Sequence, residues 1–213
     1  PDAPSWCQSS AATLGRFESA DEFAGAEFAA LASKLAPATA KAYRAALRWI
    51  EKERLDAVCL FNGRMDAMRA VMQAARTANV PCVSLERTWF GDGLQLIPND
   101  NCLGLKEIHR MMRQWRDRPL ERRQAERAAS LIASRFLRRN GREWRAYNVS
   151  ARMIEWPHRD ATRKVLLVPG SRNEVWGHPD WASAWGDTLT GYDALIEHLQ
   201  LRPHELVLRC HPN

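Results

Sequence analysis

The pattern of hydrophobic and polar positions between Ala57 and Leu85 predicts a complete strand–helix–strand unit. The short apolar run Ala57–Phe61 is typical of a strand that is buried on both faces of a parallel sheet. Val80–Leu85 predicts a second strand. Between them, apolar residues at helical spacing indicate the sheet-facing side of a crossover helix: Met68, Val71, Met72 and Ala75.

Helices are predicted before this unit and a long loop after it. Ser19 and Glu22 have the spacing of a capping box, which predicts the start of a helix. Pro37 predicts its end, and a second helix is expected from Ala38 to Arg54. The segment Thr88–Gly104 has little periodicity and reads as a loop at the carboxyl edge of the sheet.

A second unit of the same kind is predicted near the end of the chain. Lys164–Val168 and Glu205–Leu208 read as strands, and a helical pattern begins near Thr188 between them. Two helices, 105–115 and about 120–139, separate the two units. Weak periodicity over 143–163 predicts a linker, so the expected domains are residues 1–155, with basic helices over 105–140, and residues 156–213.

The fold class expected from this order of elements is α/β, with a second domain that is incomplete. Only about fifty residues follow Lys164, which are too few to close a doubly wound sheet. We therefore expect the chain to be part of a longer protein.

Polar side chains follow both strands of the first unit. Asn62, Gly63 and Arg64 come after the first strand, and Glu86 and Arg87 come after the second. Ligands of open α/β sheets bind at the carboxyl ends of the strands, so this edge is a candidate site. The alternative is a tight turn flanked by surface charges, because strand ends are often polar without a function.

The second unit repeats this arrangement with a different set of groups. Ser171, Arg172 and Asn173 follow its first strand, and Arg209 and His211 follow its last. Backbone N–H groups, a hydroxyl, an amide and guanidinium groups are suited to phosphate oxygens. The sequence here is neither a P-loop nor a dinucleotide fingerprint, and a plain surface turn is the alternative.

Two blocks of sequence resemble a known family. FNGR, from Phe61, with LER, from Leu85, resembles the acceptor-side domain of bacterial capsule- and lipopolysaccharide-type glycosyltransferases of the two-Rossmann (GT-B) architecture. KVLLVPGSRNEVWGHPDW, from Lys164, with ELVLRCHPN, from Glu205, resembles the start of their nucleotide-sugar-binding domain.

This resemblance implies two Rossmann-like domains and transfer of a sugar from a nucleotide-sugar donor to a surface polysaccharide or lipid-linked glycan. It implies no cofactor and no metal ion. If the reaction inverts the sugar, Glu86 is the expected base and Asp92 the second choice. The expected sites are Asn62, Gly63, Arg64 and Arg87 for the acceptor, and Ser171, Arg172, Asn173, Arg209 and His211 for the donor.

Charge is distributed unevenly along the chain. The whole chain carries +6, whereas residues 106–152 contain fourteen Lys or Arg and five Asp or Glu, a net charge of +9. An anionic membrane surface is therefore a candidate partner, and a solvated helix face is the common alternative. Five scattered cysteines without a C-x-x-C pair, and no apolar stretch of spanning length, favour the cytoplasm, with peripheral attachment at the inner face of the membrane.

Two other functions remain open at this point. The basic segment alone would suit a nucleic-acid-binding module, but it lacks a recognisable reading motif, and we expect no nucleic acid partner. A nucleotide-sugar epimerase of the same two-Rossmann architecture would share the donor cleft, and analysis of the reaction products would distinguish it from a transferase.

Overall fold

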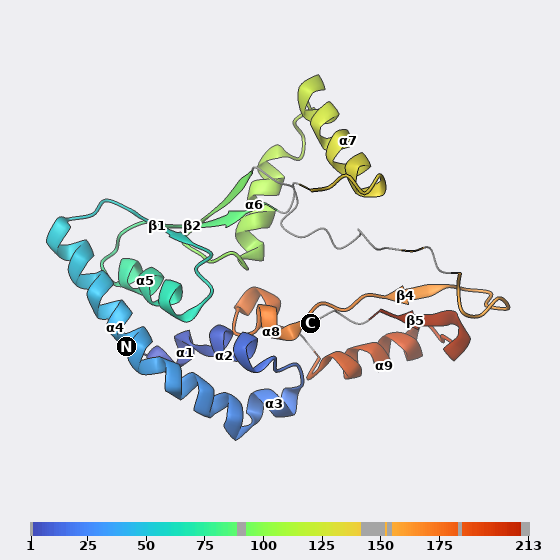
Figure 1. Ribbon diagram of the computed structural model, residues 1–213, viewed down its shortest axis with the longest axis horizontal. Helices are drawn as coiled ribbons and strands as arrows, with labels where there is room; N and C mark the ends of the chain where they lie inside the picture. Colours follow the sequence, from blue (N-terminus) through green and yellow to red (C-terminus); the bar gives the residue numbers. More distant parts are fainter. Residues whose placement is uncertain (1, 89–92, 142–151, 153–154, 183–184, 210–213) are drawn as a thin grey trace.

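The chain has a mixed α/β fold in which helices predominate. The computed structural model describes residues 2–88, 93–141, 152, 155–182 and 185–209 (Figure 1). Its described strands form two small sheets, one with the order β1-β2-β3 and one that pairs β4 with β5. Each sheet contains one parallel pair, β1 with β2 and β4 with β5, which confirms the predicted parallel units.

The N-terminal part is built from four helices: α1 (Ala3–Trp6), α2 (Gln8–Gly15), α3 (Ala20–Ala24) and α4 (Ala26–Glu53). The capping box is confirmed, because the Ser19 hydroxyl accepts the Glu22 N–H and the Glu22 carboxylate accepts the Ser19 N–H. The predicted helix end at Pro37 is wrong, since α4 continues through this residue. Thr39, two residues further on, is buried and donates to the Leu35 carbonyl.

The first parallel unit consists of β1 (Val58–Phe61), α5 (Asp66–Thr77) and β2 (Cys82–Arg87). Leu60 and Cys82 face a buried cluster that α4 and α5 also supply. Burial of β1 on both faces was a wrong expectation, because Cys59 and Phe61 are exposed. The helices α4 and α5 thus cover one face of the sheet.

The segment 88–104, expected to be a loop, contains a strand. Leu94–Pro98 forms β3, which pairs antiparallel to β2 with Ile97 opposite Ser84. Ile97 is fully buried, so burial of this side chain and the ladder hydrogen bonds of the β2 edge stabilise the pairing. Glu86 therefore lies within a strand, opposite Gln95, and not beyond its end.

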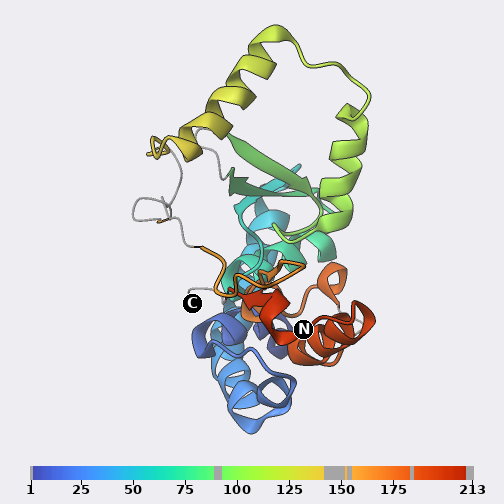
Figure 2. The same cartoon turned by 90° about the vertical axis from the view of Figure 1, so that its right-hand side faces the viewer.

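Two helices, α6 (Leu105–Trp115) and α7 (Arg122–Phe136), follow the sheet and confirm the predicted helical segments. α7 stands at the opposite end of the molecule from α1, α2 and α3 (Figures 1 and 2), whereas the start of α6 contacts the 3₁₀ turn η1 (Pro179–Trp181) through Lys106. Neither helix has a buried residue among those described.

The second parallel unit comprises β4 (Val165–Leu167), α9 (Thr188–His198) and β5 (Leu206–Leu208). Between β4 and α9 lie the short helix α8 (Arg172–Val175) and the 3₁₀ turn η1 (Pro179–Trp181); a second 3₁₀ turn, η2 (Pro203–Glu205), precedes β5. The buried Glu205 carboxylate binds the side chains of Thr162, Arg163 and Arg202.

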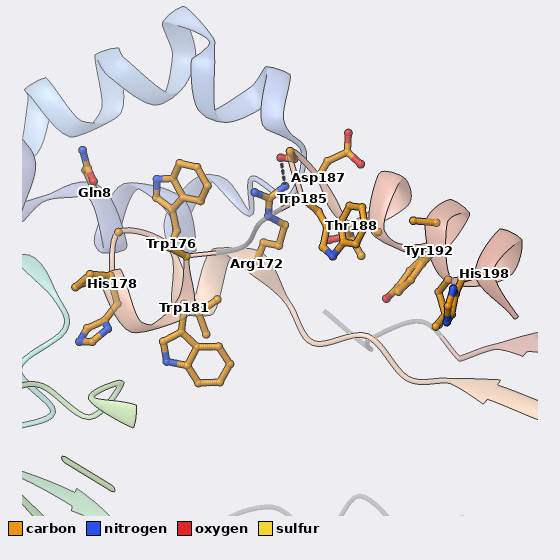
Figure 3. A pocket seen from close by; sticks show the side chains of 18 residues that line it. Gln8, Arg172, Trp176, His178, Trp181, Trp185, Asp187, Thr188, Tyr192 and His198 are labelled. Atoms are coloured by element: carbon orange, nitrogen blue, oxygen red, sulfur yellow. Dashed lines mark hydrogen bonds between the residues drawn. The ribbon is translucent and has the colours of Figure 1, made fainter. Parts of the chain in front are cut away.

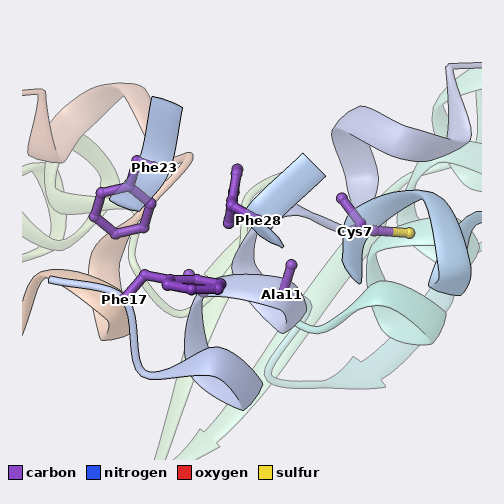
Figure 4. Packing of buried hydrophobic residues seen from close by; sticks show 7 residues of the cluster. Cys7, Ala11, Phe17, Phe23 and Phe28 are labelled. Carbon is purple, nitrogen blue, oxygen red and sulfur yellow. The ribbon is translucent and has the colours of Figure 1, made fainter. Parts of the chain in front are cut away.

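Two hydrophobic clusters lie along α4. The first surrounds Phe17, Phe23 and Phe28 (Figure 4) and the second lies under the sheet. Trp176 joins the first cluster by stacking on Phe23, with ring centroids 3.5 Å apart and planes 2° apart. The segment 171–181 therefore packs against the N-terminal helices. The predicted domain boundary after residue 155 stays a prediction.

No helix among the described residues combines the length and apolar character that crossing a membrane requires.

A glycine after β1 is required by its conformation and its surroundings. Gly63 has a φ of +73°, and a Cβ at this position would lie 2.6 Å from Met72 Cε and 3.0 Å from Asn101 Cβ. We expect Gly63→Ala to lower the free energy of unfolding by at least about 1–2 kcal/mol, the cost of a left-handed non-glycine residue. Urea unfolding measures this change.

Gly186→Ala is the matched control, because a Cβ there meets no atom within 4 Å. We expect it to change the free energy of unfolding by no more than about 0.5 kcal/mol. Equal losses in the two variants would contradict the conformational role of Gly63.

Candidate functional site: a cleft beside the second parallel unit

The carboxyl ends of β1 and β2 lie together, and their polar groups are paired. The Asn62 N–H donates to the Leu85 carbonyl, and Asn62 Nδ2 donates to Glu86 Oε2 at 2.6 Å. Asn62 Oδ1 accepts the backbone N–H of Arg64 at 3.0 Å. These bonds fix the amide of Asn62 and the carboxylate of Glu86 in one orientation.

Arg64 connects this edge to the second candidate site. Its Nη1 donates to Ser9 Oγ at 3.2 Å and Thr13 Oγ1 at 3.1 Å on α2, and to the Glu174 carbonyl at 2.9 Å on α8. The structure thus brings the predicted acceptor-side residue Arg64 next to the segment that carries Ser171, Arg172 and Asn173.

The donors of that segment bind a carboxylate from the same chain. Ser171 Oγ and Asn173 Nδ2 donate to Glu18 Oε1, and the backbone N–H of Arg172 donates to Glu18 Oε2 at 2.6 Å. Ser171 and Asn173 are buried. The prediction that these groups form an anion-binding loop agrees with their chemistry, but the anion in the structure is Glu18.

The capping box of α3 positions Glu18. The backbone N–H groups of Glu18 and Ser19 both donate to Glu22 Oε2 at 2.8 Å, which shapes the turn between α2 and α3. These bonds, together with one from the Ser19 hydroxyl, hold the pKa of Glu22 below its usual value. A local helix signal in the sequence therefore sets up a contact across more than 150 residues.

The guanidinium of Arg172 is held by aromatic rings and a carbonyl. Its carbon lies 5.5 Å from the ring centroid of Trp176 and 5.7 Å from that of Phe23, within the range of cation–π attraction. Its Nη1 donates to the Gly186 carbonyl at 3.2 Å (Figure 3). Arg172 thereby links α8 to the start of α9.

An open cleft of about 1210 Å³ lies beside Arg172, between the segment 172–182 and α9. Large enough for a nucleotide-sized ligand, it combines apolar walls with a few polar groups, as ligand sites commonly do. Trp181 and Trp185, four residues apart, both line this cleft. Its walls include Arg172, Trp176, Trp181, Trp185, Tyr192 and His198 (Figure 3).

A second cluster joins the β3–α6 loop to η1. Asp100, His178 and Asp180 each place a ligand atom within 4.8 Å of the others. The Asp180 N–H donates to His178 Nδ1 at 3.1 Å, so a neutral His178 carries its proton on Nε2, which faces Asp100 Oδ1 at 3.2 Å. Metal binding through Nε2 would require the other tautomer and would break the bond to Asp180. The hydrogen bonds of His178 therefore suit a link between the β3–α6 loop and η1 better than a metal site.

Lys106 adds two contacts to this cluster. Its backbone N–H donates to Asp180 Oδ2 at 2.9 Å and its ammonium lies 3.3 Å from Oδ1, and both contacts lower the pKa of Asp180. Burial raises the pKa of Asp100, but hydrogen bonds from His178 and Asn101 outweigh it and the net shift is downward. Both carboxylates are thus stabilised in the charged form.

The remaining predicted site residues are placed as follows. The backbone N–H of Arg209 donates to the Leu167 carbonyl, so the ends of β4 and β5 are adjacent as expected. Arg87 is exposed at the end of β2, and Asp92 and His211 lie outside the described residues. Sequence reasoning missed Glu18 and the pairing of Asp100 with His178, because no local pattern indicates partners so distant along the chain.

Comparisons with protein-family models, with curated proteins and with solved structures each gave no match to this chain. The family resemblance described above therefore rests on its own residues.

We expect Glu18→Gln to destabilise the contact between the α2–α3 turn and residues 171–173. The Gln amide keeps the shape of the side chain, but its NH2 group would face the N–H and O–H groups that donate to Glu18. We expect this change to lower the free energy of unfolding by about 1–2 kcal/mol. Thermal and urea unfolding measure the loss. Glu51→Gln on the exposed face of α4 is the control, and a similar loss in both variants would refute a specific role for Glu18.

Proposed function

We propose that this chain contains the acceptor-side domain and the beginning of the donor domain of a nucleotide-sugar-dependent glycosyltransferase with two Rossmann-like domains. The observation that carries the proposal is the cleft between the segment 172–182 and α9, which combines stacking aromatic rings with the guanidinium of Arg172. Aromatic faces suit a base or a sugar ring, and a fixed guanidinium suits phosphate oxygens.

The contacts of the loop after β4 refine the proposed donor site. Because Ser171, Asn173 and the Arg172 N–H bind Glu18, these groups act as a support for the segment. The guanidinium of Arg172 points along the cleft wall and gives one hydrogen bond to Gly186, and an arginine has five N–H donors. The donor diphosphate is therefore assigned to the Arg172 side chain.

The acceptor side is assigned to the edge formed by Asn62, Arg64 and Glu86. An inverting transfer needs a base for the acceptor hydroxyl, and Glu86 is oriented for this role by its bond from Asn62. The leaving nucleotide would be stabilised by Arg172. The proposed setting is the cytoplasmic side of a membrane, where nucleotide-sugars meet lipid-linked glycans.

Arg172→Ala is expected to weaken nucleotide binding by about 1.5–3 kcal/mol, the range for a hydrogen bond to a charged group. Calorimetry with uridine, cytidine and guanosine diphosphates would identify the preferred nucleotide and measure the loss. Arg48→Ala, an exposed arginine on α4, is the control. Equal affinities of parent and Arg172→Ala for the preferred nucleotide would place the donor site elsewhere.

Glu86→Gln is expected to lower kcat by about 10² or more while leaving the fold intact, because the amide keeps the shape but cannot accept a proton. Turnover is measured in the full-length enzyme with its donor and acceptor. Normal kcat with an unchanged melting temperature would show that Glu86 is not the base.

A further inference from the structure

The hairpin 105–139, which comprises α6, the turn 116–121, α7 and the three residues that follow it, has an unusual surface. Its features go beyond the proposed transfer reaction. None of its helical residues is buried, yet large apolar side chains occur along its whole length. Phe136 is 84% exposed, more than any other large hydrophobic residue that the structure describes. The exposed apolar residues of this hairpin are Met112, Trp115, Leu120, Ile132, Phe136 and Leu137.

These apolar side chains are segregated from the charges. On α7, Ala125, Ala129, Ile132 and Phe136 recur at helical spacing and share one face, whereas Arg123, Arg127 and Ser130 fall on the opposite side. On α6 the apolar positions Ile108, Met112 and Trp115 likewise form one stripe. The hairpin is therefore amphipathic along both of its helices.

The hairpin is also strongly basic. Residues 105–139 contain eleven Lys or Arg and four Asp or Glu, a net charge of +7 that exceeds the +6 of the whole chain. Two ion pairs within the helices, Arg110 with Glu107 and Arg122 with Glu126, leave this net charge unchanged. A surface with both features attracts a partner that is negatively charged and also offers an apolar phase.

We propose that the α6–α7 hairpin binds the interface of an anionic lipid bilayer. Apolar side chains enter the boundary between headgroups and acyl chains, and the arginines bind lipid phosphates, as in amphipathic helices that lie in the membrane plane. A nucleic acid would satisfy the charge but would leave the apolar stripe in water. A second copy would bring two surfaces of +7 together, so charge disfavours self-association through this face.

The arrangement of the molecule suits such attachment. The hairpin extends from η1, where α6 begins, to the end of the structure opposite to α1, α2 and α3, where α7 stands away from the sheet (Figures 1 and 2). The core clusters around Phe28 and beneath the sheet take no residue from α6 or α7. Binding through the hairpin therefore does not require the core to open.

Flotation of the 213-residue chain with two kinds of vesicle tests the proposal. One kind is phosphatidylcholine alone, and the other is an equimolar mixture of phosphatidylglycerol and phosphatidylcholine. We expect binding to the anionic vesicles to be much the stronger. Replacing both Arg123 and Arg127 by Gln should weaken it about fivefold for each arginine removed, and Phe136→Ser should weaken it by roughly tenfold or more.

Matched controls lie on α4, where Arg44, Arg48 and Trp49 are exposed. The Arg44→Gln/Arg48→Gln pair and Trp49→Ser repeat the same chemical changes outside the hairpin, and we expect them to leave vesicle binding unchanged. Circular dichroism of all variants should match the parent, because every replaced side chain is exposed.

Three results would overturn the proposal. One is equal or negligible binding to the two kinds of vesicle. Another is a dimer in light scattering that Phe136→Ser dissociates, together with no vesicle binding, which would identify a second copy as the occupant. The third is displacement of the chain from anionic vesicles by RNA while Phe136→Ser binds them as tightly as the parent, which would identify a purely electrostatic nucleic-acid surface.

Discussion

The arrangement of the candidate site depends on how residues 171–181 are held against the N-terminal helices. Two contacts do this: the Glu18 carboxylate accepts three hydrogen bonds from Ser171, Arg172 and Asn173, and the Trp176 ring stacks on Phe23. The first pairs the buried side chains of Ser171 and Asn173 with a carboxylate, and the second buries a large aromatic surface. Together they set the position of the Arg172 side chain and of one wall of the cleft.

Features with a local cause were predictable from the sequence. The capping box at Ser19, the crossover helix α5 and the parallel pairs β1–β2 and β4–β5 follow from spacing within short windows. Features with a distant cause were not predictable. The helix continues past Pro37 because packing on both sides of this residue outweighs the lost hydrogen bond, and β3 forms because Ile97 is buried against β2.

The candidate site shows the same division. The positions of the candidate residues after predicted strands indicated that Asn62 lies close to Glu86, and that Ser171–Asn173 suit an anion. They could not indicate that the anion is Glu18, since a glutamate beside a capping box has the pattern of a solvent-exposed residue. In the proposed donor site, the guanidinium of Arg172 and the aromatic walls of the cleft are assigned the role that the loop as a whole was expected to have.

The 28-residue helix α4 has a consequence for unfolding. At 1.5 Å per residue it is about 42 Å long, and its first half supplies Phe28 and Ala32 to one hydrophobic cluster while its second half supplies Ala46 and Ile50 to the other. Both clusters pack against the same continuous helix, so unfolding of α4 removes contacts from both of them. The sheet and the aromatic cluster that holds Trp176 are therefore coupled mechanically, and they should melt as one cooperative unit despite their separate cores.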